Sequence, residues 1–377
     1  MEARTLPDAL KAIMEQRGWT QAQLARHWGV SQAWISRVCG GIADTGVARA
    51  QELLSRVAWE VRFSPRVEEP VERREFLAAA ASVVFVPSAA DADPYRDSGY
   101  VRTLADSLAR SRYELGGLPL TSRAILHSRR VSALTVTSLA REMQEAASDL
   151  MYQVSVTFYD AGRLAQSEHA GTLALDFAFH AQDFPAQARA YDVLSRVALY
   201  RKDATRAVQH AQRGLRIPDL PASRSSSLHM RLGRALIAVS KQDRDARDAL
   251  ETALTTHSLS PFAEAALGGD VAIGLSQLGH YDRADALLRD AAHVMSRYSP
   301  LFQAQYLGRQ AQTAIRAGRP SLTAEYMETL TRALPFISSA RVDSRVHDIL
   351  HCTKAWERIP EIRAARARLQ QMLIAES

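Results

Sequence analysis

From about Tyr100 onward, the chain carries a pattern that favours helices over strands. This segment is rich in Ala, Leu and Arg, and no run of alternating β-branched residues in it is long enough to indicate a sheet. With 377 residues, of which 47% are hydrophobic, the chain is long enough for two or three domains with buried cores. The sequence therefore predicts an all-α protein of more than one domain.

An internal repeat organises this helical segment. Residues 271–284 resemble the central part of a tetratricopeptide repeat, in which a small residue after a turn lets two helices pack closely. Sliding this template along the chain places small residues at Ser167, Ala207, Ala246, Ala284 and Thr323. The turns five residues earlier fall at Gly162, Lys202, Lys241, Gly279 and Gly318. The steps of 38 to 40 residues exceed the roughly 34 of the standard repeat, which predicts longer helices or loops.

Stacked helix pairs of this kind form a superhelix whose concave surface suits a peptide or a helix. On the template, certain positions in the first helix of each pair face that surface. They are Tyr152, Tyr159, Arg189, Asp192, Arg196, Arg231, Gln305, Arg309 and Gln312. Arg and Tyr combine contact area with hydrogen-bond donors, so these residues form the candidate ligand groove. The alternative for each of them is a solvated position or a contact within the array.

Three short helices are predicted before this array, in the first forty residues. Apolar spacing indicates a helix over residues 6–17 that stops at Gly18. Thr20 is an N-cap candidate for a second helix, which ends at Gly29, and Ser31 caps a third. Two short helices joined by a glycine turn are the helix-turn-helix unit, whose second helix enters the major groove of DNA.

The N-terminal segment resembles the Xre/Cro family of phage-repressor-like DNA-binding domains. The matching positions are Thr20-Gln21, Leu24-Ala25, Gly29-Val30-Ser31-Gln32, Ile35-Ser36 and the closing Gly40 or Gly41. The resemblance covers about residues 6–60, including a following helix predicted from Val47 to Val61. It implies that Gln21 caps the second helix against a phosphate and braces Gln32, which would address a base.

The third helix supplies the candidate DNA contacts. Gln32 is suited to a bidentate contact with adenine, and Ser31 and Ser36 are candidates for phosphate or base contacts. Trp34 departs from the polar or small residue usual at its position. Two alternatives stay open for it, contact with a thymine methyl or burial against a neighbouring helix. Arg37 is assigned to phosphates or to an internal ion pair rather than to a guanine.

Four regions are predicted: residues 1–62 as the helix-turn-helix domain, 63–99 as a linker with a buried helix, 100–147 as a capping or coupling element, and 148–377 as the repeat domain. Arg73-Arg74 and the apolar run after them imitate a twin-arginine export signal. Because this run is internal and too short to span a bilayer, a buried helix over residues 73–86 is predicted instead. The final helices, broken at Pro360, are expected to cap the solenoid, with a dimer interface as the alternative.

Sequence signatures of catalysis are absent. There is no Gly-Lys dipeptide for a P-loop, and HExxH, GxSxG and zinc-spaced Cys/His patterns are missing. The two cysteines, Cys39 and Cys352, form no CxxC pair, which favours a reducing interior. Residues 1–62 carry eight basic and six acidic residues, so non-specific DNA affinity should be modest. These observations predict a non-enzymatic protein without cofactor, metal or membrane segment.

The order of the two regions resembles the Gram-positive peptide-pheromone receptors, which couple an Xre-type domain to a tetratricopeptide array and act as dimers. The resemblance implies a cytoplasmic, nucleoid-associated bacterial transcription regulator that binds double-stranded DNA as a homodimer and senses a peptide or protein ligand, as in quorum sensing. Those receptors commonly clamp the peptide backbone with Asn, and this chain contains no Asn, so Gln and Arg would substitute. Two alternatives stay open: a scaffold whose array holds a partner protein, and a ligand-free regulator whose repeats only dimerise it.

Overall fold

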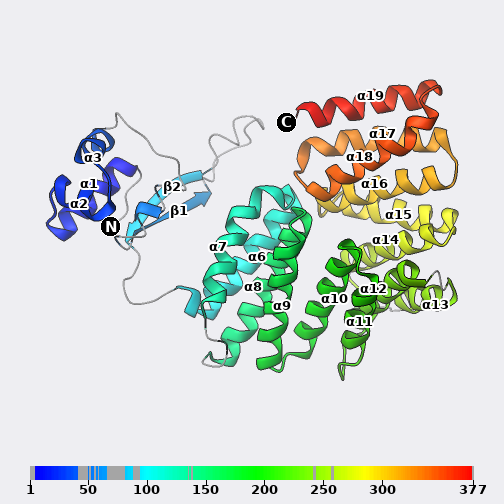
Figure 1. The fold of residues 1–377 in the computed structure, drawn as a ribbon, viewed down its shortest axis with the longest axis horizontal. Coiled ribbons are helices and arrows are strands. Elements are labelled where there is room, and N and C mark those ends of the chain that lie inside the picture. Colours follow the sequence, from blue (N-terminus) through cyan, green and yellow to red (C-terminus); the bar gives the residue numbers. More distant parts are fainter. Residues whose placement is uncertain are drawn as a thin grey trace. The chain divides into compact units, whose positions relative to one another are not determined.

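The structure is a computed structural model, and it describes residues 5–40, 50, 52–54, 57, 59–65, 81–87, 94–134, 136, 139–240, 243–255 and 259–375. The chain divides into two compact units, Met1–Asp93 and Pro94–Ser377. Helices make up most of the described part of both units (Figure 1). Among the described residues, no helix combines the length and the apolar character needed to cross a bilayer.

The N-terminal unit begins with three short helices, α1 (Leu6–Arg17), α2 (Gln21–Trp28) and α3 (Gln32–Cys39). Gly18 and Gly29 end the first two with φ of 62° and 68°, a left-handed conformation that glycine adopts without a steric penalty. Thr20 starts α2 through a reciprocal capping box with Gln23. The three predicted helices are therefore confirmed, together with the turns between them.

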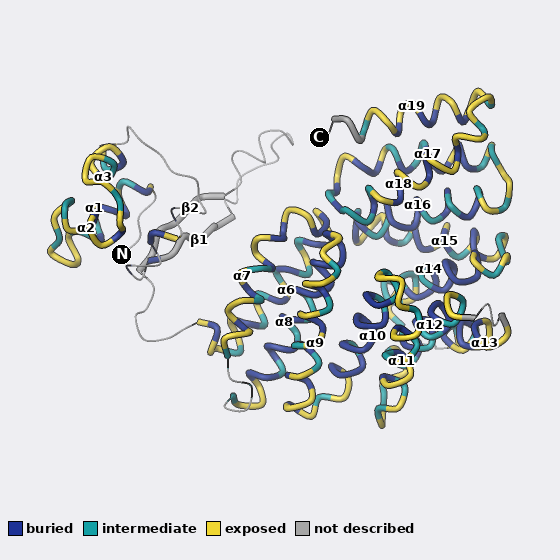
Figure 2. The backbone as a smooth tube through the Cα atoms, viewed as in Figure 1, coloured by how far each residue is buried: buried dark blue, intermediate teal, exposed yellow. Residues whose placement is uncertain are grey.

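A small apolar core holds these helices together (Figure 2). Its fully buried members include Leu10, Ile13, Leu24, Ile35 and Val38. The helix predicted over residues 47–61 is helical at residues 50 and 52–54, and residue 57 lies in a turn. Residues 41–49, 51, 55, 56 and 58 lie outside the described residues. The predicted end at residue 61 is wrong, because the chain is already in a strand at residue 59.

A β-hairpin follows this core. Strand β1 (Trp59–Pro65) pairs antiparallel with β2 (Ala81–Pro87), with Val61 opposite Phe85. The buried helix predicted over residues 73–86 is therefore wrong for its last six residues, and the rest of it lies outside the described residues. The reason is local composition, because consecutive β-branched and aromatic residues in 83–86 favour a pleated strand.

The C-terminal unit is a solenoid of antiparallel helices (Figure 1). After the short 3-10 helix η1 (Pro94–Arg96), it begins with α6 (Ser98–Leu115), η2 (Leu118–Leu120) and α7 (Thr121–Ser132). Helix pairs follow: α8 (Arg141–Asp160) with α9 (Leu164–His180), α10 (Phe184–Tyr200) with α11 (Ala204–Leu215), α12 (Ala222–Ser240) with α13 (Asp243–Leu254), α14 (Pro261–Gln277) with α15 (Tyr281–Met295), and α16 (Pro300–Arg316) with α17 (Pro320–Ala333). The last helices are α18 (Ala340–Cys352) and α19 (Pro360–Ala375).

Burial and backbone geometry confirm the predicted repeat register. The small residues after the turns are all 0% exposed: Ser167, Ala207, Ala246, Ala284 and Thr323. The predicted turn residues Gly162, Lys202, Gly279 and Gly318 have φ of 73°, 64°, 87° and 68°. The fifth, Lys241, lies outside the described residues. A small residue lets the paired helices touch, as where the Ser195 hydroxyl donates to the carbonyl of Ala207 at 2.8 Å.

The boundaries of the array differ slightly from those predicted. Helix α8 begins at Arg141, so the predicted boundary between residues 147 and 148 falls inside this helix. The predicted break near the C-terminus is present, because Pro360 is the first residue of α19. Proline is favoured there, since the first helical N–H has no intrahelical acceptor.

The first and last parts of the solenoid contact each other. The N–H of Ser338 donates to the carbonyl of Leu115 at 2.7 Å, and the N–H of Leu118 donates to the carbonyl of Ser338 at 3.3 Å. This approach requires a glycine at position 116, where a Cβ would lie 2.2 Å from the carbonyl oxygen of Ser338. The contacts close the concave surface between its N-terminal and C-terminal edges.

The carboxylate of Asp160, at the end of α8, joins the two edges from the inside. Its side chain is 1% exposed. It accepts hydrogen bonds from the N–H of Gly117 at 2.6 Å, the hydroxyl of Ser339 at 2.7 Å and the amide of Gln305 at 3.2 Å. The guanidinium of Arg341 lies 3.7 Å away. One buried acceptor thus connects η2, α8, α16 and the start of α18.

Candidate functional site

Helix α3 presents a polar face to solvent. The hydroxyl of Ser31 accepts a hydrogen bond from the N–H of Trp34 at 3.2 Å and so caps the helix. Ile35 and Val38 are fully buried and hold α3 on the core. The exposed positions of the helix include the predicted contact residues Gln32, Ser36 and Arg37, and Ser31 is exposed as well. The fold thus keeps these polar side chains free for an external partner.

Two other predicted contact residues, Trp34 and Gln21, are only partly exposed to solvent. Trp34 is half-buried and packs against the core of the N-terminal unit, so only part of its ring is open to a partner. Gln21 is the first residue of α2 and is also half-buried. In the described structure no hydrogen bond joins Gln21 to Gln32, so the expected brace is not formed. Thr20, rather than Gln21, caps α2.

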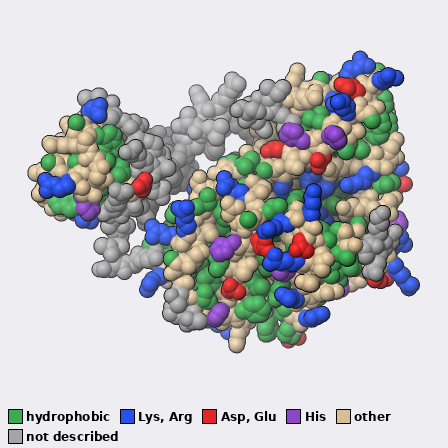
Figure 3. Space-filling model, in the orientation of Figure 1, with side chains coloured by type: hydrophobic (Ala, Val, Ile, Leu, Met, Phe, Trp, Pro, Cys, Tyr) green, Lys and Arg blue, Asp and Glu red, His purple; other side chains and the backbone are tan. Residues whose placement is uncertain are grey.

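The described part of the N-terminal unit carries few charges. Figure 3 shows isolated basic and acidic side chains on the face in view, without a continuous basic surface. Arg26 and Arg37 are exposed and close to the ends of α2 and α3. Electrostatic attraction to phosphates from these described residues is therefore limited.

A cavity opens on the concave surface of the solenoid. Its volume is about 270 Å³, and it lies between the α8–α9 turn, α10, α16 and α18. A narrower recess of about 20 Å³ shares the walls formed by Tyr159, Tyr200, Arg309, Arg341 and Arg345. The recess extends past these residues to Asp270 on α14. The cavity and recess together form the second candidate site.

Most of the predicted groove residues meet at this site. Tyr159, Arg196, Arg231, Gln305 and Arg309 line the recess, and Gln312 lines the cavity. Asp192 lies beside the recess, with its carboxylate 3.1 Å from Arg196 and 2.9 Å from Arg231. Tyr152 and Arg189 line neither space. The Arg189 guanidinium lies 4.9 Å from the centre of the Tyr152 ring and pairs with Asp149.

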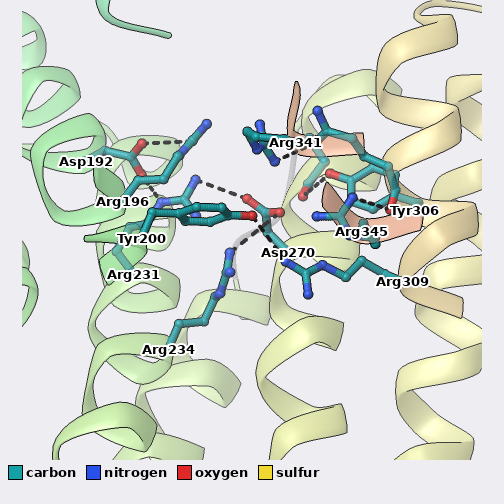
Figure 4. A network of polar contacts seen from close by, with 12 residues as sticks. Asp192, Arg196, Tyr200, Arg231, Arg234, Asp270, Tyr306, Arg309, Arg341 and Arg345 are labelled. Carbon is teal, nitrogen blue, oxygen red and sulfur yellow. Dashed lines mark hydrogen bonds and ion pairs between the residues drawn. The ribbon is translucent and has the colours of Figure 1, made fainter. Parts of the chain in front are cut away.

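Charges one repeat apart alternate in sign along the concave surface (Figure 4). Asp192, Arg231, Asp270 and Arg309 recur at intervals of 39 residues. Arg231 bridges two carboxylates, with 2.9 Å to Asp192 and 3.0 Å to Asp270. Arg234 lies 3.8 Å from Asp270 on its other side. These four residues, the charge ladder, lie on α10, α12, α14 and α16, and ion pairs join the first three.

Guanidinium groups outnumber carboxylates around the recess. Six arginines line it, Arg196, Arg231, Arg234, Arg309, Arg341 and Arg345. The carboxylates paired with them are Asp160, Asp192 and Asp270. The site therefore carries an excess of positive charge before any ligand binds.

This excess changes the pKa values of the groups at its centre. Burial alone would raise the pKa of Asp270, but the charges of Arg231 and Arg234 hold it below its usual range. Burial would also raise the pKa of Tyr200, and the surrounding guanidiniums, Arg341 first, instead lower it well below its usual value. Burial, followed by the charge of Arg309, lowers the pKa of Arg345 to about 9.

The prediction missed several lining residues. Tyr200 and Arg234 lie one helical turn after the predicted Arg196 and Arg231, on the same helix faces. The 39-residue interval from Arg231 would have identified Asp270. Two further residues, Arg341 and Arg345, are on α18, which follows the last repeat that the template recognised. In the part of the chain that the structure describes, no group of three or more His, Cys, Asp or Glu is arranged to hold a metal ion.

Comparison with known proteins supports the N-terminal assignment. Residues 6–57 match a family described as a helix-turn-helix domain. No curated protein matches the chain.

Solved structures resemble the chain at low identity. A Rap protein in complex with competence and sporulation factor is 12% identical with a TM-score of 0.48, covering 94% of this chain and 99% of that one. PlcR of Bacillus thuringiensis, in complex with a peptide and DNA, is 11% identical with a TM-score of 0.34, covering 97% and 99%. A kinesin light chain of Podosopora anserina with tetratricopeptide-like repeats is 16% identical with a TM-score of 0.35, covering 50% and 96%. The match over residues 6–57 and the regular turns and buried small residues of the helix pairs show a helix-turn-helix domain joined to a tetratricopeptide-like solenoid.

Proposed function

We propose that the protein is a transcription regulator that binds duplex DNA through α3 and senses a ligand in the cavity of its solenoid. The observation that carries the proposal is the exposed polar face of α3 within a helix-turn-helix domain. Buried Ile35 and Val38 hold this helix on the core, so its polar side chains are already positioned before DNA binds. Regulation then follows from a ligand that binds two states of the protein with different affinity.

Each residue of this face has a proposed role. Gln32 donates to and accepts from the edge of an adenine, which presents N6 and N7 in the major groove. Ser31, Ser36 and Arg37 contact phosphates, with Ser36 also in reach of a base edge. Gln21, at the first turn of α2, contacts a phosphate near the positive end of that helix. The exposed part of the Trp34 ring contacts a thymine methyl.

We further propose a homodimer that binds two half-sites about one helical turn apart. The described N-terminal residues carry little charge, which limits the DNA affinity of one protomer. Two recognition helices on one DNA site raise that affinity. The protein then acts at the chromosomal DNA of the cytoplasm.

The ligand is proposed to be a peptide or a segment of a partner protein. Support comes from the predicted groove residues that line the cavity and its recess, including Tyr159, Arg196, Gln305, Arg309 and Gln312. Because the chain has no Asn, Gln and Arg side chains take over contacts to the peptide backbone. The 270 Å³ cavity accepts a short segment rather than a long one.

Replacing Gln32 with Ala is expected to weaken binding to a selected DNA site by about 1–3 kcal/mol and to relax preference at one base pair. The change removes a bidentate contact without touching the core, because Gln32 is exposed. Competition binding against a panel of single-base variants measures both effects. A matched control is Gln371→Ala, an exposed glutamine on α19. Unchanged affinity and unchanged base preference in the Gln32 variant would refute the assigned contact.

A further inference from the structure

The alternation of charge at 39-residue intervals continues on α18, where Asp348 follows Asp192, Arg231, Asp270 and Arg309. Arg345, about one turn before Asp348 on the same helix, shares the lining of both spaces with Arg309. Among the described residues, neither Arg309 nor Arg345 forms an ion pair. Asp348 is the acidic residue of the cavity lining, and it is exposed.

The two arginines are held in place by neutral groups. Arg309 donates to the amide oxygen of Gln312 at 2.9 Å and to the hydroxyl of Tyr200 at 3.3 Å. Arg345 donates to the carbonyl of Gln305 at 3.3 Å, and it is 5% exposed. These bonds orient the guanidinium groups but leave their positive charges without an opposite charge. A buried charge without a partner is costly, which indicates that a ligand completes the site.

Unused hydrogen-bond donors point to the same place. The Nε atoms of Arg234, Arg309 and Arg341 are buried and have no hydrogen-bond partner among the described residues. Arg234 is 7% exposed, and all three side chains line the recess. Figure 4 shows these side chains converging around Asp270 and the ring of Tyr200. Buried donors of this kind are normally satisfied, so the recess lacks an acceptor.

We propose that Arg309 and Arg345 bind an oxyanion group, a carboxylate, of the ligand that the solenoid senses. Guanidinium groups match the geometry of such oxygens and bind them with charge-assisted hydrogen bonds. Tyr200 lines both spaces, and its oxygen accepts from Arg309 at 3.3 Å, so it helps to hold that arginine in place. This inference rests on the ligand-sensing part of the proposed function and names the chemical class of the ligand.

The dimensions of the site restrict what carries the oxyanion. The wider cavity holds about 270 Å³, at the lower end of the roughly 300–1,000 Å³ of ordinary ligand pockets. The occupant is therefore a compact anion or the carboxylate end of a short peptide. Both sources offer the same group to the two arginines, and the experiment below separates them.

Two matched pairs of probes test the site on the full-length protein. Succinate is compared with succinamide, and an acetylated trialanine with a free C-terminus is compared with its C-terminal amide. In each pair, shape is similar and charge differs. At constant ionic strength, the anionic member of at least one pair should raise the thermal midpoint by about 2 °C or more at tenfold its Kd, while its neutral partner should not. A shift with succinate identifies a compact anion as the ligand, and a shift with the trialanine acid identifies the carboxylate end of a peptide. Equal responses to charged and neutral members, or no response to either anion, would overturn the proposal.

Variants locate the effect. The double variant Arg309→Gln with Arg345→Gln should lose the anion-dependent shift. Arg283→Gln should keep it, because Arg283 is 51% exposed, pairs with Glu251 and lies outside both cavity linings. An undiminished shift in the double variant would contradict the assignment. If the double variant does not fold, the comparison of charged and neutral probes on the unmodified protein still decides the question.

A DNA-binding assay on the same preparation tests the regulator function separately from the oxyanion site. If the protein binds its selected DNA site but responds to none of the four probes, the oxyanion site is refuted and the DNA-binding function is supported. If it responds only to the anions and selects no DNA, the regulator function is refuted and the oxyanion site is supported.

Discussion

Replacing Asp160 with Ala should destabilise the solenoid by about 3–5 kcal/mol. The carboxylate is 1% exposed and accepts from the Gly117 N–H, the Ser339 hydroxyl and the Gln305 amide, with Arg341 close by. Removing it leaves these donors without an acceptor in a buried position, and each unsatisfied group carries its full desolvation cost. Urea denaturation followed by circular dichroism measures the loss as a shift of the midpoint.

Asp282→Ala is the matched control for this variant. Asp282 also pairs with an arginine, Arg319 at 2.7 Å, but its side chain is 84% exposed. An exposed pair of this kind contributes less than about 1 kcal/mol. If both variants lose the same small amount, the buried junction between the two edges of the solenoid does not have the role assigned to it.

Asp270→Asn should have the second large effect, a loss of about 3 kcal/mol at pH 7. The substitution keeps the size of the side chain but removes the negative charge between Arg231 and Arg234, which lie 3.0 and 3.8 Å away. Arg196, Arg231 and Arg234 would then have Asp192 as their one remaining carboxylate among the described ion pairs, and Asp192 already pairs with the first two. The side chain of Asp270 is 21% exposed, so solvent compensates little.

The effect of Asp270 should depend on pH with a definite sign. Its pKa is lowered in the folded protein, so its contribution to stability is present above the unfolded value of about 3.9 and is lost as pH falls below it. The stability difference between the unmodified protein and Asp270→Asn should therefore narrow below about pH 4, by up to about 1.4 kcal/mol per pH unit. Asp290→Asn, an exposed carboxylate on α15, corrects for the general titration of the surface. A difference that stays constant from pH 7 to pH 2.5 would contradict the depressed pKa.

Local signals explain why the helices of both units were predictable. The caps and glycine turns of α1 to α3 are set by residues within a few positions of each boundary, such as Thr20 and Gly29. The repeat register was predictable because a buried small residue and a left-handed turn are required at the same place in each pair. Both are properties of single positions that a periodic template detects.

Features that depend on distant segments were not predictable in the same way. The sequence predicts a helix where the structure has the strand Ala81–Pro87, because an apolar run of this length fits either structure and the partner strand lies more than fifteen residues earlier. The junction at Asp160 joins residues up to 179 positions apart, and no local sequence pattern predicts it. Arg341 and Arg345 were also missed, because they lie on α18, which follows the last repeat that the template recognised; Arg345 reaches the recess by packing on α16, where it donates to the carbonyl of Gln305.

The candidate site was predicted in part for the same reason. The template identified Arg231 and Arg309 from their position in a helix, and the 39-residue interval contained Asp270 as well. Charge balance, in contrast, depends on which side chains finally pair. Only the folded arrangement distinguishes Arg231, which is bridged by two carboxylates, from Arg309, which meets none among the described residues.

The most direct test of the account is selection of DNA sites from a random-sequence pool by the full-length protein. The account predicts enrichment of an inverted repeat whose half-sites are centred about one helical turn apart, with an adenine whose selection depends on Gln32. A pool that stays random after repeated rounds, under conditions in which the protein is folded, would contradict DNA recognition by α3 and would favour a scaffold whose solenoid alone carries the function.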